Sequence, residues 1–251
     1  FVVASNLDIR IANAQTTAEI RMSTNSSLTI QNSTGAADRL TATNDNTQLY
    51  FIDSFFDVFT ELDLGGTSNR FIVGTGAVVR TPAVRVLQGD PGPCGVDIKG
   101  GTLVVTNGTT NATVDIIRGE FRLAGGTAIV NRIVATGLTA AVAFTSGVCL
   151  LNSSYISNNL PFAIGHDDTN TPPAVLWMVS GTNVFPCGCE IGRNGILRGK
   201  GIIDMRREDL AIFVKGRIEP GDSPGIVTVL GSLALTNTSV IDIEIGGTNV
   251  G

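Results

Sequence analysis

Short runs that alternate apolar with polar or small residues recur along the whole chain, and turn residues follow each run. In the C-terminal part, Ile241, Ile243 and Ile245 lie on one face of a predicted strand, and the residues between them lie on the other. A chain that turns this often without a helical period is typical of a parallel β-solenoid. In that fold each turn buries its inward face only against the turns above and below.

The alternation predicts strands through most of the chain, with about 20–25 residues in each turn of the solenoid. Its 251 residues then make about ten to twelve turns. We expect one continuous solenoid over 1–251, with a loop insertion at 88–95 where turn residues gather. The expected strands are 7–11, 18–22, 27–31, strands within 48–64, 70–73, 78–80, 84–87, 96–98, 102–106, 113–117, 120–123, 128–134, 142–150, 174–179, 196–203, 211–214 and the C-terminal runs.

Composition agrees with an all-β interpretation. Charged residues make up 16% of the chain, against about 25% in ordinary soluble domains, and glycine accounts for 30 residues. Mean hydropathy is +0.26, but the longest apolar stretch, 137–151, is too short to span a membrane and contains polar residues. The net charge of −5 argues against a nucleic-acid partner.

The C-terminal quarter carries a family resemblance. Residues 215–225 read KGRIEPGDSPG, three short strands follow, and 244–247 read EIGG; the stretch 192–201 fits the same pattern loosely. This part, about 192–251, resembles the passengers of bacterial autotransporters and other surface proteins with autotransporter-associated β-strand repeats. The resemblance implies a right-handed, single-stranded parallel β-helix, secretion to the bacterial cell surface or beyond, and a stalk, adhesin or matrix role. It implies no catalytic residue.

The four cysteines form part of a repeated pattern. Pro-Cys-Gly precedes both Val96 and Cys189, so Cys94 and Cys187 occupy similar corners, and Cys149 lies between them in the sequence. In a secreted protein four cysteines favour disulfides, with Cys94–Cys187, Cys149–Cys189 or a bond to another subunit as the choices. A zinc site that uses Cys187 and Cys189, or buried free thiols, are the alternatives.

Aromatic residues cluster at one place in the chain, between 50 and 59. The first interpretation is that the rings stack inside the solenoid or cap one end of it. The second is an exposed patch that binds a partner subunit or a sugar. The candidates for this patch are Phe51, Phe55, Phe56 and Phe59.

One loop offers candidate chemistry, because the only histidine, His166, precedes Asp167 and Asp168. Glycoside cleavage needs two carboxyl groups about 5–10 Å apart, one of them with a raised pKa. The two aspartates are adjacent and lie before a Pro-Pro turn, which favours a polar surface loop. A weak calcium site at these aspartates and a hydrolase site remain open; no other cofactor is expected.

Both ends of the chain resemble bare β-strands, and the chain does not begin with Met. Either caps lie outside these residues, or a neighbouring copy pairs with each end and forms a filament. A non-enzymatic filament, sheath or stalk subunit is therefore the leading hypothesis, followed by a glycan- or cell-binding adhesin and then a polysaccharide-degrading enzyme. The candidate end contacts are Phe1, Val2, Val3, Ile241, Ile243 and Ile245.

Overall fold

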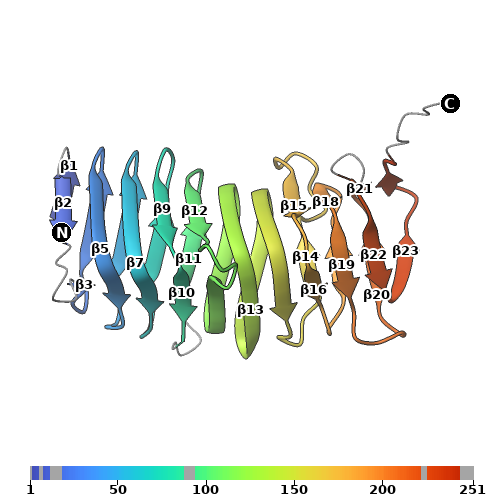
Figure 1. Cartoon of the computed structure of the whole chain (residues 1–251), viewed down its shortest axis with the longest axis horizontal. Helices are drawn as coiled ribbons and strands as arrows, with labels where there is room; N and C mark the ends of the chain where they lie inside the picture. The colour runs from blue at the N-terminus through green and yellow to red at the C-terminus, as the bar shows by residue number, and fades with distance from the viewer. Residues whose placement is uncertain (1, 6–7, 12–18, 88–93, 222–224, 244–251) are drawn as a thin grey trace.

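The computed structural model describes residues 2–5, 8–11, 19–87, 94–221 and 225–243. The chain is a right-handed parallel β-solenoid, and the described residues contain no helix. The rod is elongated, with β1 (Val2–Ser5) at one end and β23 (Ser232–Leu235) at the other (Figure 1). The predicted fold class is confirmed.

Three ladders of parallel strands run along the rod. The first contains β1, β4 (Ser27–Gln31), β6 (Gln48–Ile52), β8 (Arg70–Val73), β11 (Gly95–Ile98), β14 (Phe162–Ile164), β17 (Cys189–Ile191), β20 (Ala211–Val214) and β23. The second contains β2 (Asp8–Ile11), the starts of β5 (Thr34–Ala42) and β7 (Phe55–Leu64), β9 (Val78–Thr81), β12 (Thr102–Val105), β15 (Ala174–Met178), β18 (Gly195–Gly199), β21 (Arg217–Pro220) and β24 (Val240–Ile241). The third contains β3 (Glu19–Arg21), the ends of β5 and β7, β10 (Ala83–Val86), β16 (Thr182–Val184), β19 (Gly201–Asp204) and β22 (Val227–Leu230).

The long strand β13 (Thr113–Ile156) bends around the corners and contributes to all three ladders. The sequence pattern predicts four separate strands over this range. They are continuous because glycines such as Gly119 and Gly126 take the corners with positive φ angles of 91° and 78°, so no loop is needed.

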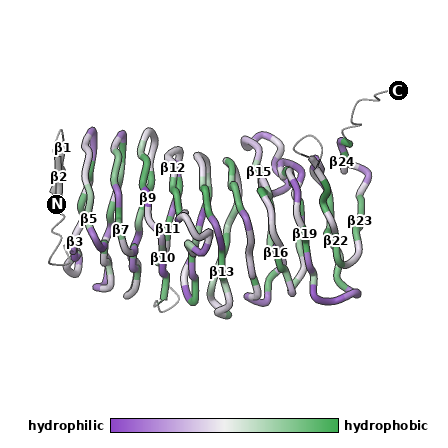
Figure 2. The backbone as a smooth tube through the Cα atoms, in the orientation of Figure 1, coloured by the Kyte–Doolittle hydropathy of each residue, from purple (hydrophilic) through white to green (hydrophobic). Residues whose placement is uncertain are grey.

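The core is a stack of apolar side chains held in register. Leu28 pairs with Leu49, Leu49 with Phe71, Phe71 with Val96, and Val96 with Phe121. Figure 2 shows the same alternation along the tube, with a hydrophilic corner between β19 and β20. The described pairings run through about nine turns, fewer than the ten to twelve expected. The expected number was too high because loops lengthen several coils; Gly147, for example, pairs with Ala174.

Corners before the first ladder repeat one backbone conformation. Asn25, Asn46 and Ser68 each lie two residues before a strand and have positive φ angles of 56°, 54° and 59°. The N–H of Asn25 donates to the carbonyl of Asp45 at 3.0 Å, so the corners are hydrogen-bonded between coils as well. Asparagine tolerates this left-handed conformation better than most residues, which explains its frequency in the turns.

A column of buried residues follows those corners. Thr47, Asn69 and Cys94 each directly precede a strand of the first ladder, and all three are buried. The Asn69 side chain accepts a hydrogen bond from the N–H of Thr47 at 2.7 Å and donates to the carbonyl of Ala42 at 2.9 Å. It also donates to the carbonyl of Gly65. Asn69 therefore satisfies backbone groups that the corner leaves inside the core.

Candidate functional site

The last described coil, formed by β22, β23 and β24, exposes side chains that occupy core positions. Leu233 pairs with Ile212 and Leu235 with Val214, so all four point toward the core. Ile212 and Val214 are fully buried, whereas Leu233 is 41% exposed and Leu235 is 53% exposed. Among the described residues no strand pairs with the far side of this coil. We call the face made by Leu233, Leu235 and Ile241 the end surface.

The end surface includes one of the candidate contact residues. Ile241 pairs with the buried Ile218 and is 38% exposed, and the neighbouring Ile243 is largely exposed. At the other end of the rod, the backbone of β1 pairs in parallel with β4. Val2 and Val3 lie in β1, and Phe1 and Ile245 lie outside the described residues.

The predicted disulfides within one chain are absent, because all four cysteines are free. Cys94 precedes β11 and Cys187 precedes β17, so the coils between them, each about 4.8 Å thick, separate the thiols by much more than the 7 Å that a bridge tolerates. Cys149 and Cys189 lie in different ladders. The similar Pro-Cys-Gly corners therefore do not stack on each other. A bond from the half-buried Cys187 to another subunit stays a prediction.

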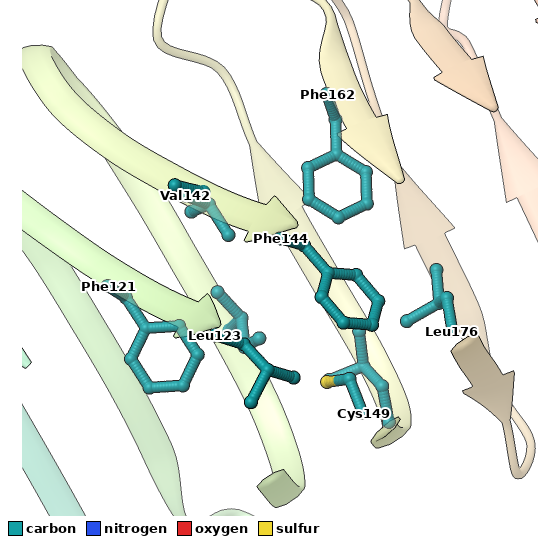
Figure 3. A pocket seen from close by; sticks show the side chains of 10 residues that line it. Phe121, Leu123, Val142, Phe144, Cys149, Phe162 and Leu176 are labelled. Atoms are coloured by element: carbon teal, nitrogen blue, oxygen red, sulfur yellow. The ribbon is translucent and has the colours of Figure 1, made fainter. Parts of the chain in front are cut away.

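Cys149 and Cys189 are core residues. Figure 3 shows the Cys149 sulfur among Leu123, Phe144 and Leu176, beside a cavity of about 10 Å³ with an apolar lining. Such a cavity stays dry because it offers no hydrogen-bond partners to water. Burial raises the pKa of both thiols to about 12. Both thiols therefore remain protonated near neutral pH.

The aromatic cluster divides between the inside and the outside of the solenoid. Phe51 and Phe56 are fully buried, with ring centroids 5.2 Å apart, and the Phe51 ring also packs at a tilt against Phe71, with centroids 5.3 Å apart. These two rings cannot belong to a binding patch, and that part of the patch hypothesis is wrong. Phe59 is exposed, and Phe55 packs under the Arg80 guanidinium at 4.6 Å. The alternation along β6 and β7 explains this division, since neighbouring residues face opposite sides.

The loop after β14 holds its two aspartates in ionised form. The Asp167 carboxylate pairs with Lys215 at 2.9 Å, and this contact lowers the pKa of Asp167. The backbone N–H of Asn170 donates to Asp168 at 2.9 Å and lowers the pKa of that carboxyl group. Neither aspartate therefore has the raised pKa that a general acid requires. The described residues contain no group of three or more histidine, cysteine or acidic side chains that could hold a metal ion.

A charged cluster on the third ladder was not predicted from the sequence. Glu61 of β7 is buried between Arg39 and Arg85, at 3.3 Å from the latter, and Asp63 pairs in register with Arg85. Burial, and then the charge of Glu61, raise the pKa of Asp63. The sequence feature behind it is that acidic and basic residues alternate from one coil to the next, as in Glu19, Arg39 and Glu61. This alternation can be recognised only once the register between the coils is known. Because Glu61 is buried and pairs with an arginine on each side, we interpret the cluster as a stabilising ion-pair ladder.

Comparison of the chain with protein-family models, with curated proteins and with solved structures finds no match. Within the described part of the chain, no helix is long and apolar enough to cross a membrane. The features established for this protein are thus its fold, its filled core and its end surface.

Proposed function

We propose that the chain is a non-enzymatic structural protein whose rigid solenoids associate end to end in a filament, sheath or stalk. The observation that carries this proposal is the end surface, where Leu233, Leu235 and Ile241 occupy core positions and remain partly exposed. Apolar side chains next to a strand edge favour pairing with another strand.

The proposed occupant of the end surface is the first coil of a second copy. All strands of one ladder run in the same direction, so the two ends of a solenoid present complementary edges. A second copy would place β1 on β23, β2 on β24 and β3 on β22, and would continue all three ladders. Such a head-to-tail contact does not close on itself, and it propagates into a fibre.

The proposed location is outside the cell or at a bacterial cell surface. Its support is the resemblance of residues 192–251 to autotransporter-associated repeats. A structural rather than an enzymatic role fits the ionised state of Asp167 and Asp168, described above.

Electron microscopy and sedimentation velocity of the purified chain over a range of concentrations test the proposal. The unmodified protein is expected to form filaments that lengthen with concentration. A double substitution, Leu233→Lys with Leu235→Lys, is expected to give discrete rods, because it places two charges on the end surface.

The matched control is Phe213→Lys on β20. Phe213 is 56% exposed, close to Leu235, but it faces away from the core on the side of the rod. It should leave filaments intact, and circular dichroism should show that all variants keep their β-structure. Discrete rods formed by the unmodified protein at every concentration, or equal loss of filaments in the Phe213 variant, would contradict the proposal.

A further inference from the structure

A polar groove lies on the outer face of the third ladder, away from the end surface. Its volume is about 350 Å³, within the range of small-molecule sites. The floor is formed by β13 and β16, one wall by the loop between β12 and β13, and the other by the corner between β19 and β20. The loop that forms the first wall crosses the ribbon beside β13 in Figure 1.

Two arginines bring positive charge to this groove from separate coils. Arg132 of β13 is exposed, and no described side chain forms an ion pair with it. Arg206 pairs through its Nε with Asp204 at 3.2 Å, and Asp204 pairs in register with Val184 of the groove. None of the residues that line the groove is acidic. Asp204 balances the charge of Arg206, so Arg132 is the unpaired positive charge of the groove.

The first wall contributes an oriented amide. Thr109 donates to the Oδ1 atom of Asn111 at 2.8 Å, and Asn107 donates to the same oxygen. The carbonyl end of the Asn111 amide is therefore occupied, and its Nδ2 group remains as a donor. Asn111 thus adds a neutral donor to the two guanidinium groups.

Both walls have unusual backbone conformations. Thr110 has a φ angle of 58° and Arg206 one of 59°. A positive φ is costly for a residue other than glycine, and more so for a β-branched one such as Thr110. The loops that flank the groove hold these conformations, which fix the positions of Asn111 and Arg206.

The floor combines an aromatic ring with hydroxyl groups. Tyr155 of β13 is half-buried and pairs in register with Val184, and both residues line the groove. Ser153 and Thr182 flank the ring with hydroxyl groups that donate and accept hydrogen bonds. A ring beside hydroxyl and amide donors suits the apolar face and the hydroxyl groups of a sugar.

We propose that this groove binds an acidic saccharide, with the ligand carboxylate held by Arg132, which no described carboxylate pairs with, and the sugar ring placed on Tyr155. A planar guanidinium matches a carboxylate with two parallel hydrogen bonds, which explains the preference for an acidic sugar over a neutral one. This binding site is independent of end-to-end assembly, because no residue of the groove belongs to the end surface.

Isothermal titration calorimetry with a glucuronate-containing disaccharide tests the proposal, with the disaccharide that has glucose in place of glucuronate as the comparison. The acidic ligand is expected to bind at least about tenfold more tightly. Arg132→Gln should remove that preference and leave binding of the neutral disaccharide unchanged, and Tyr155→Leu should weaken both.

Arg118→Gln is the matched control, because Arg118 is also an exposed arginine of β13 but does not line the groove. It should bind both disaccharides as the unmodified chain does. The proposal is overturned if neither disaccharide binds, if the Arg118 and Arg132 variants lose equal affinity, or if inorganic phosphate binds as tightly as the acidic disaccharide. The last result would identify a general anion site. Each titration is performed with the Leu233→Lys, Leu235→Lys variant, which is expected to form discrete rods. The binding result therefore does not depend on whether the unmodified chain assembles.

Discussion

The buried rings of Phe51, Phe56 and Phe71, here called the phenylalanine stack, and the side chains of the end surface occupy the same kind of inward-facing position in the fold. Phe51 and Leu235 both point inward from a strand of the first ladder. Phe51 has a coil on each side of it and is fully buried, whereas Leu235 has a described coil on one side only and is 53% exposed. A side chain in a core position of a solenoid is therefore buried by the neighbouring coils and not by its own coil.

The largest effect expected from this difference is on stability. Phe51→Ala removes a ring that packs on Phe56 and Phe71, and we expect it to lower the free energy of unfolding by about 3–5 kcal/mol. Leu235→Ala removes a side chain that is already half in solvent, and we expect a loss below about 1 kcal/mol. Urea unfolding followed by circular dichroism measures both values.

Both variants must be measured at protein concentrations where the chain does not assemble, because association adds stability to the end surface. Equal losses for the two substitutions would show that the last coil is covered as completely as the phenylalanine stack. That result would remove the contrast on which the proposed function depends.

A smaller effect is expected for the polar column beside the same stack. Asn69→Ala leaves the N–H of Thr47 buried without its side-chain partner, whereas the carbonyl of Ala42 keeps the N–H of Gly65 as a donor at 3.0 Å. An unpaired buried group costs about 1–3 kcal/mol, and thermal or urea unfolding should detect the loss. Asn237→Ala in the last coil is the control, because Asn237 is exposed, and it should change stability little. A loss no greater than that of the control would mean that water satisfies these groups in the variant.

The buried thiols are expected to have the smallest effect on the free energy of unfolding at neutral pH. Their effect increases at alkaline pH. The pKa of Cys149 and Cys189 rises from 9.0 to about 12 in the folded chain, so between these values the unfolded chain binds fewer protons than the folded one. Stability is therefore fully present below about pH 9 and falls as pH rises toward 12, by up to about 1.4 kcal/mol per pH unit for each thiol.

Unfolding curves from pH 8 to pH 11 for the unmodified chain and for Cys149→Val test this dependence. The variant lacks one of the two thiols, so its stability should fall less steeply above pH 9. Identical slopes would show that other groups cause the alkaline loss.

The repetition of strands could be read from the sequence because each strand encodes its own alternation. The strands 27–31, 70–73 and 211–214 were predicted with the bounds observed. The strand β5 was missed, because Arg39 and a register shift between Ala37 and Arg39 interrupt its alternation. The strand β13 was divided, because glycines that bend a strand resemble glycines that end one.

Features that depend on the register between coils could not be predicted in this way. The cysteine corners have the same local sequence, yet loops of different length place them in coils that do not touch. The groove collects residues from five separate stretches of the sequence, which come together only after the coils have stacked. A single-residue error in any coil length would move every later side chain to another position.

The parallel ladders also determine how the rod carries a mechanical load. The hydrogen bonds between coils, such as the 2.8 Å bond from the N–H of Gly95 to the carbonyl of Asn69, join one coil to the next along the long axis. Tension between the ends therefore acts on these bonds coil after coil, and the weakest junction sets the breaking force. Bending is resisted differently, because the three ladders are distributed around the cross-section like the wall of a tube. Such a rod is stiff against bending and separates under tension at its weakest junction between coils.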